Sequence, residues 1–335
     1  MKLEKSRSWR WGVNRWIILV LVILGVFAAR AYPPILPHVQ LPAEAITGRL
    51  FTLPVIGDFY LSNTLLATLI GDVLLLVLAL VIRRAIRSGE LVLRGVAGAV
   101  EALMEALYSM AESTAGKWAA TIFPWMAAIV MLVLISNWLE LIPGTDSIGL
   151  IHHAEGTAQG YPVQEIARLG GLPVVTIVKP EGEAAGEGEG YILAPFVRVA
   201  STDLNFTISL AVISVVMSQI VGIRALGLSY FTKFLNFKTF FSRPLFGVID
   251  FGVGLLELIS ETSKILSFGF RLFGNIFAGS VLLFVIGSLI PVFAQSAVLL
   301  FEFFIGLIQA LIFGMLTLVF MSQATAGHAH EEATH

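Results

Sequence analysis

Apolar runs long enough to cross a lipid bilayer recur along this chain and constrain its fold more than any other feature. They lie at about residues 61–82, 119–142, 204–224 and 293–322. A helix needs roughly 18–20 apolar residues to cross a hydrocarbon core of about 30 Å, and none of these runs alternates with period two as barrel strands do. Hydrophobic residues make up 57% of the 335, and the mean hydropathy is +0.87. The sequence therefore predicts an all-α integral membrane protein with about five to six membrane helices.

The N-terminal segment 1–31 allows two interpretations. Its apolar part follows a basic stretch, which fits a membrane anchor, but Ala29 and Ala31 also form the A-x-A pattern of a signal-peptide cleavage site. We favour the uncleaved anchor. A Pro-rich external connector is expected over 32–60.

The middle of the chain combines membrane helices over 61–144 with a long polar segment. Within it, residues 90–116 predict an amphipathic surface helix, because Glu101, Glu105 and Glu112 share one face, and this helix should lie on the membrane or against a partner helix. Residues 145–202 are acidic and Gly-rich, which predicts an external loop with a flexible middle.

A long helix dominates the C-terminal region 203–323, which we expect to form the channel. Between Pro244 and Pro291 there are 46 residues without a proline, about 69 Å if helical throughout. Such a helix must bend, break or tilt steeply, and with the last apolar run it forms a membrane hairpin. A polar tail, 324–335, follows.

Basic residues predict the orientation. If the N-terminus is cytoplasmic, the segments on that side hold 14 Lys and Arg and the opposite side holds five, so the acidic loop is external and the C-terminus cytoplasmic. The two remaining basic residues, Lys264 and Arg271, lie inside the long helix, where topology does not explain them.

Those two cations belong to a polar stripe. At 100° per residue, five side chains fall within about 40° of one line: Glu257, Glu261, Lys264, Arg271 and Asn275. The last helix repeats Gln295, Glu302 and Gln309 every seven residues. A charge inside a membrane helix costs several kcal/mol unless it faces protein or water, so these residues indicate a partner or a pathway. The two stripes, on adjacent arms of the hairpin, can meet each other or line aqueous clefts. The alternative is a buried Arg271–Glu302 ion pair that only fixes packing.

Other classes of function find less support. A secondary transporter usually shows paired repeats, and an intramembrane hydrolase needs a nucleophile or metal motif; neither is present in the sequence. The chain has no cysteine, and a loop and a tail hold the histidines that might bind metal: His152, His153, His328, His330 and His335. We therefore predict no metal site, no cofactor and no catalytic residue.

Four stretches together resemble a known family. "FGFRLFGNIFAG" (268–279), followed by "LIQALIFGMLTLVFMS" (307–322), resembles the C-terminal signature of subunit a of the F-type ATP synthase; "SNWLELIPG" (136–144) and "STDLNFTISLAV" (201–212) are similar to its third and fourth spans. The resemblance implies a non-catalytic stator subunit of a bacterial-type plasma membrane, with two offset proton half-channels. The implied partners are the rotor ring of subunit c, the peripheral-stalk subunit b, the rest of the complex and the bilayer, but no nucleic acid.

The resemblance also implies residue roles. Arg271 matches the essential arginine that faces the rotor carboxylates, Gln309 the glutamine across the hairpin, and Asn275 the asparagine one turn beyond. Glu302 matches the external half-channel position, with Ser280 where some members carry an acid. The other matched positions are Asn137, Glu140, Asp203 and Asn205 on the external route, and Glu257 and Lys264 toward the cytoplasmic exit.

Simpler roles are open for several of these residues. Glu140 could be an ordinary acid at a helix end, and Asp203 with Asn205 could cap the fourth span. Asp72, in the second span, either lines the external funnel or pairs with a neighbouring subunit. Three glycines spaced by five residues, Gly269, Gly274 and Gly279, are expected to permit close helix approach.

Overall fold

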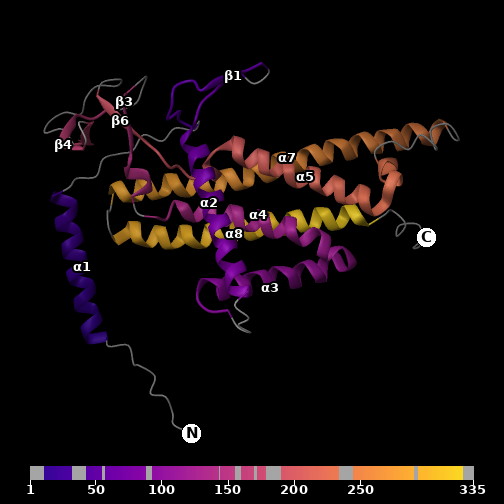
Figure 1. Cartoon of the computed structure of the whole chain (residues 1–335), viewed down its shortest axis with the longest axis horizontal. Coiled ribbons are helices and arrows are strands. Elements are labelled where there is room, and N and C mark those ends of the chain that lie inside the picture. The colour runs from indigo at the N-terminus through magenta and orange to yellow at the C-terminus, as the bar shows by residue number, and fades with distance from the viewer. Residues whose placement is uncertain are drawn as a thin grey trace, which may run out of the picture. The chain divides into compact units, whose positions relative to one another are not determined.

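The computed structural model describes residues 11–31, 43–54, 57–87, 93–142, 144–154, 160–169, 172–178, 190–233, 244–289 and 293–326. Helices dominate this part of the chain (Figure 1). The helices are α1 Trp11–Ala31, α2 Asn63–Arg87, α3 Val96–Ala115, α4 Ala119–Leu139, α5 Leu204–Leu226, α7 Pro244–Leu289 and α8 Phe293–Thr325. The predicted mostly helical membrane fold is confirmed.

Among the residues that the structure describes, five stretches are long and apolar enough to cross a membrane. They are α2, α3 with α4 as one stretch (Val96–Leu139), α5, most of α7 and most of α8. The 3₁₀ turn Gly116–Trp118 joins α3 to α4 and makes them nearly continuous. The helix predicted between Pro244 and Pro291 forms as one element of 46 residues.

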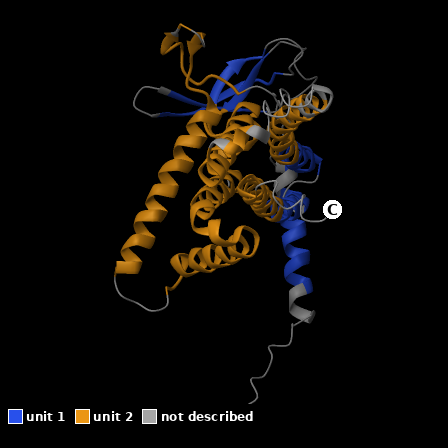
Figure 2. Ribbon diagram, turned by 90° about the vertical axis from the view of Figure 1, so that its right-hand side faces the viewer, with its two compact units in different colours: residues 1–39, 150–194, 278–302 blue, residues 40–149, 195–277, 303–335 orange. Residues whose placement is uncertain are grey.

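The described chain divides into two compact units (Figure 2). Unit 1 contains residues 1–39, 150–194 and 278–302, and unit 2 contains residues 40–149, 195–277 and 303–335. Helices α7 and α8 each contribute to both units.

The apolar core of unit 2 lies where α4, α5, α7 and α8 meet. Fully buried side chains such as Met126 and Val130 of α4, Leu272 of α7, and Leu318 of α8 belong to it. Phe268 of α7 lies beside two α8 rings, Phe313 and Phe320, at centroid distances of 5.0 Å each. The facing apolar stripes of the two long helices therefore explain their packing.

Helix α3 packs on α4 through one face. Leu107 and Ala111 are buried in the core, whereas Glu101, Glu105 and Glu112 are exposed, as the amphipathic pattern predicts. Of the two places expected for this helix, the one against a partner helix agrees with these contacts, and the partner is α4 of the same chain.

Two of the three regularly spaced glycines permit close approach. A Cβ at Gly269 would lie 2.6 Å from Ile208 Cδ1 of α5, and one at Gly279 would lie 2.0 Å from Glu302 Oε1 of α8. At Gly274 no described residue of the chain lies within 4 Å of such a Cβ. The expectation is thus confirmed at Gly269 and Gly279, whereas Gly274 makes no close approach to another described helix.

Short strands occur where the sequence analysis expected a loop. Strands β4 (Val163–Leu169) and β5 (Leu172–Ile177) form an antiparallel hairpin with a bulge between Glu165 and Ala167, and β3 (Gly149–His153) pairs with β6 (Tyr191–Pro195). The apolar and β-branched residues of "LPVVTI" favour strand over loop. The Gly-Glu-rich middle, 181–189, lies outside the described residues.

A second small hairpin precedes α2. Strands β1 (Phe51–Leu53) and β2 (Gly57–Phe59) pair antiparallel, with Phe51 and Phe59 stacked at 4.7 Å between ring centroids. Helix α2 that follows has an exposed apolar face, including Val73 and Leu76, and Asp72 is exposed as well.

Candidate functional site

Arg271 is exposed on α7, next to buried residues of the same helix. Leu272 and Ile276 point into the core of unit 2 with 1% and 0% exposure, while Arg271 and Asn275 are exposed. Arg271 makes no hydrogen bond and no ion pair with any residue in the described part of the chain. A permanent charge on an apolar helix of membrane length is therefore left without an internal counter-ion.

Gln309 is buried in α8, and its neighbour Ala310 belongs to the core. Both Gln309 and Arg271 lie in unit 2, but no hydrogen bond joins them among the described residues. The guanidinium is exposed and can meet groups outside the chain, whereas the amide is buried.

Glu302 of α8 lies against Gly279 of α7 within unit 1. Its side chain is 4% exposed, and Oε1 has no hydrogen-bond partner among the described residues. Ser280, the next residue of α7, is also buried. A buried carboxyl oxygen without a partner is costly, which is the condition under which a carboxyl group holds a proton or a water.

Buried polar side chains gather where α2, α4 and α5 meet in unit 2. Asn137 donates from Nδ2 to the Gly306 carbonyl at 3.1 Å and accepts from Ser201 Oγ at 2.6 Å. Nearby, Ser136 Oγ and Asn63 Nδ2 are buried and have no partner in the described chain. Unpartnered buried polar atoms commonly hold ordered water, so this cluster is suited to hydration.

Asp203 begins α5 and joins it to α2. One carboxylate oxygen accepts from the Asn205 backbone N–H at 2.9 Å, and the other accepts from Thr64 Oγ1 at 2.8 Å. The proposed capping role is confirmed for Asp203, because an N-cap aspartate satisfies one of the free N–H groups of the first turn. The Asn205 side chain itself is exposed.

Arg198 lies among acidic groups in the segment before α5. Burial lowers the pKa of its guanidinium, against the opposing effect of four surrounding carboxylates: Glu44, Asp203, Asp146 and Glu140. Burial also raises the pKa of Asp146 to about 6, although Arg198 acts to lower it. Glu140, at the end of α4, is 7% exposed, which is unlike an ordinary surface acid.

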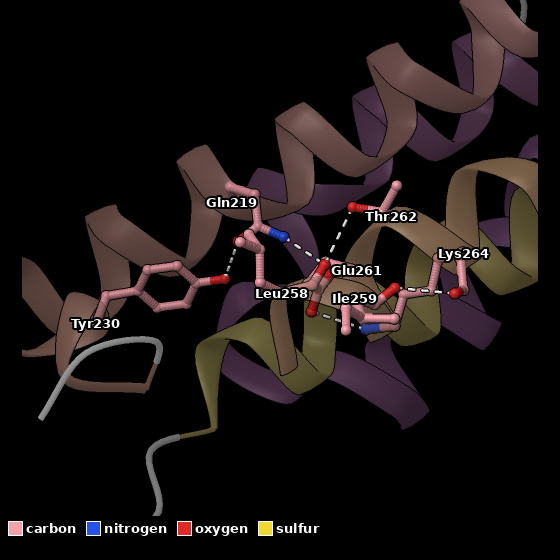
Figure 3. A network of polar contacts seen from close by, with 8 residues as sticks. Gln219, Tyr230, Leu258, Ile259, Glu261, Thr262 and Lys264 are labelled. Carbon is pink, nitrogen blue, oxygen red and sulfur yellow. Dashed lines mark hydrogen bonds and ion pairs between the residues drawn. The ribbon is translucent and has the colours of Figure 1, made fainter. Parts of the chain in front are cut away.

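A second polar network lies on α5 and α7 (Figure 3). Glu261 accepts from Gln219 Nε2 at 3.0 Å and from Lys264 Nζ at 2.8 Å, and Gln219 Oε1 in turn accepts from the Tyr230 hydroxyl at 2.5 Å. Glu257, one turn earlier on α7, is half-buried. Through the contact between Glu261 and Gln219, the polar stripe of α7 thus continues onto α5.

Among the residues of these clusters that sequence reasoning missed are Thr64, Arg198, Ser201, Gln219 and Tyr230. Gln219 had a recognisable signal, since it is an amide within the apolar run of α5. Arg198 was counted only as one of the external basic residues. The other three carry hydroxyl groups, which are common at helix ends and give no comparable signal.

Comparisons with known proteins identify the family. Residues 65–322 match the family described as ATP synthase A chain. The chain is 28% identical to ATP synthase subunit a of Campylobacter jejuni over 253 residues, which are 75% of this chain and 85% of that protein. It is 36% identical to ATP synthase subunit a of Aliivibrio fischeri over 152 residues, which cover 44% and 53% of the two chains.

The matched region contains α4, α5, nearly all of α2 and α8, and the whole of α7, and with them Arg271, Glu302 and both polar clusters. It excludes α1, which the family match does not reach. The chain therefore belongs to the ATP synthase A chain family and is a multi-pass, non-catalytic, proton-translocating subunit of an ATP synthase.

Proposed function

We propose that this chain provides two offset proton half-channels and presents Arg271 to the carboxylates of a rotor ring of subunit c. The observation that carries the proposal is Arg271 itself, which is exposed on α7 and has no counter-ion in the described chain. A cation left open in this way is matched by an anion on another chain.

The guanidinium suits this role chemically. An arginine side chain stays positively charged in proteins, so it favours the ionised form of a carboxylate that comes in front of it. The carboxylate must release its proton before it reaches Arg271 and regain one after it leaves. The same fixed charge repels protons and so keeps the two half-channels separate.

The external half-channel is proposed to begin at the buried cluster of unit 2. Its access residues are Asn137, Glu140, Asp203 and Asn205, and the unpartnered atoms of Asn63 and Ser136 support water there. Glu302 of unit 1, buried and with one oxygen that has no partner among the described residues, is proposed as the proton relay of this half-channel. Gln309 and Asn275 flank Arg271 as neutral polar groups.

The cytoplasmic exit is proposed to pass along α7 beside Glu257 and Lys264. In this arrangement the N-terminus and C-terminus are cytoplasmic, in keeping with the 14 basic residues on that side. The membrane is a bacterial-type plasma membrane, and the peripheral-stalk subunit b holds the chain against the ring.

The test is Arg271→Gln in the assembled complex. We expect ATP-driven proton pumping and ATP synthesis to fall by about a hundredfold or more, because the neutral amide cannot hold the ring carboxylate ionised. Pumping is measured as fluorescence quenching in inverted vesicles that contain equal amounts of complex.

Arg84→Gln is the matched control, since Arg84 is an exposed arginine in the last turn of α2, outside the proposed pathway. It should pump normally. Robust pumping by an assembled Arg271→Gln complex would overturn the proposed role of Arg271.

A further inference from the structure

Two cations lie on one line of α7, and an ionised carboxylate that moves past this face would be attracted to both. Lys264 and Arg271 are seven residues apart, which corresponds to about 10.5 Å along the helix and about 20° around it. The proposed function needs a carboxylate to be held ionised at Arg271 alone. Something must therefore distinguish the two cations.

Lys264 is held by groups of its own chain. Its Nζ lies 2.8 Å from Glu261 Oε1, and the side chains of the pair are 22% and 11% exposed. The same Nζ lies over the Phe320 ring of α8, 4.7 Å from the centroid. A carboxylate of α7 and an aromatic ring of α8 thus share the charge of Lys264.

Glu261 is in turn fixed from a different helix. Its second oxygen accepts from Gln219 of α5, whose own oxygen accepts from Tyr230 (Figure 3). Tyr230 is 3% exposed and its ring fills the space beside Gly222, where a Cβ would lie 2.4 Å from the ring. Gln219 and Tyr230 therefore orient the Glu261 carboxylate independently of Lys264.

Arg271 has none of these contacts with the described residues, although it lies on the same helix. From this contrast we propose that Glu261, positioned by Gln219 and Tyr230, is a fixed counter-ion that cancels the charge of Lys264 and so leaves Arg271 as the one cation of α7 open to the rotor carboxylate. The inference rests on the proposed function of Arg271 and adds a specificity residue, Glu261, to it.

The consequence concerns where the rotor carboxylate becomes neutral. Beside a cancelled Lys264, an ionised carboxylate gains little and takes up a proton readily. If the charge of Lys264 were not cancelled, it would stabilise the ionised rotor carboxylate as Arg271 does. The carboxylate would then move away from α7 slowly. Glu261 thus acts through Lys264, as a positioning residue that limits the stabilisation to one place on the helix.

The experiment compares Glu261→Gln with Glu261→Gln/Lys264→Gln in the whole complex. Glu261→Gln keeps the shape and the Gln219 contact but frees the charge of Lys264, so pumping per assembled complex should fall about tenfold. The second substitution removes the freed charge, so the double variant should pump as well as Lys264→Gln alone, a variant that also measures what Lys264 itself contributes to the proposed exit. Complex content is measured by subunit recovery from the membrane, so that a defect in assembly is separated from a defect in turnover.

Two outcomes overturn the inference: normal pumping per complex in Glu261→Gln, or a loss that Lys264→Gln does not relieve. A merely structural ion pair predicts the former, with less complex recovered. Should Glu261→Gln not assemble, Tyr230→Phe replaces it, because it keeps the ring against Gly222 and loosens only the support of Glu261. Its smaller loss, about twofold, must also be relieved by Lys264→Gln.

Parallel assays of Arg271→Gln keep the two proposals apart. If Arg271→Gln abolishes pumping while Glu261→Gln pumps normally, the role of Arg271 stands and the counter-ion role of Glu261 falls. If Arg271→Gln pumps well, the proposed function itself fails.

Discussion

Arg198 lies among several opposite charges in unit 2. One guanidinium interacts with four carboxylates from three separate parts of the chain: the connector before α2, the end of α4 with the turn after it, and the start of α5. Its charge therefore opposes the repulsion that these acids would otherwise exert on one another. Asp146 shows that the compensation is incomplete, because burial still raises its pKa to about 6.

Asp146→Asn should reveal this as a pH-dependent stability difference. Because the folded-state pKa of about 6 exceeds the ordinary value of 3.8, the folded protein binds the proton more tightly. The stabilising contribution of protonated Asp146 is complete below about pH 4 and is lost as the pH rises through about 6. The asparagine variant, which never ionises, should thus melt at a higher temperature than the parent at pH 8 and at a similar temperature at pH 4.

The measurement is thermal unfolding of the complex across this pH range, with Asp58→Asn as a matched control. Asp58 lies in β2 and its side chain is 38% exposed in a surface ion pair. A stability difference for Asp146→Asn that does not change with pH would contradict the assignment.

At the scale of the element, close approach between helices depends on particular glycines. Gly269 of α7 faces Ile208 of α5 so closely that a Cβ would lie 3.3 Å from the Ile208 backbone as well as 2.6 Å from its side chain. Rotation of the isoleucine alone cannot relieve such a contact. Gly274, on the same helix, has open space around it.

Gly269→Ala and Gly274→Ala therefore form a matched pair. Alanine favours a helix by about 1 kcal/mol over glycine at both positions, but at Gly269 the clash with α5 should outweigh the gain. We expect Gly269→Ala to unfold at a lower temperature than the parent in detergent, and Gly274→Ala at an equal or higher one. Equal melting temperatures for the two variants would show that α5 and α7 can move apart at Gly269 at little cost in stability.

How far the sequence predicts these elements depends on the range of the interactions involved. Apolar runs located α2, α5 and α8 within a few residues, because the length a membrane requires is a local property. The Gln219–Glu261 contact could not be predicted, since its partners are 42 residues apart and depend on which face of α5 meets α7. For Asp203 the sequence left a cap and a channel role open; the contacts with Asn205 and Thr64 establish the cap, and the channel role stays a prediction.

At the scale of the whole molecule, orientation is the property that the basic residues predict. The proposal places the turn after α4 outside and helix α3 inside, with the cation-rich segments on the cytoplasmic side. The chain contains no cysteine, so a single introduced thiol reports its own position without background.

Ser147→Cys and Ser113→Cys test this orientation as two exposed serines in unit 2, the first in the turn after α4 and the second on α3. A membrane-impermeant maleimide added to intact cells should label Ser147→Cys and leave Ser113→Cys unlabelled until the membrane is opened. The reverse pattern would show that the chain is inserted in the opposite direction.

The contact between Gly279 and Glu302 also has a consequence for how this protein can change over generations. A Cβ at position 279 would lie 2.0 Å from the carboxylate oxygen of Glu302 and 2.6 Å from the carboxylate carbon, atoms at the flexible end of that side chain, so a larger residue at 279 would displace the carboxyl group. We expect the two positions to vary together among descendants. A side chain at 279 leaves the position of the carboxyl group undisturbed only where a shorter residue has already replaced Glu302.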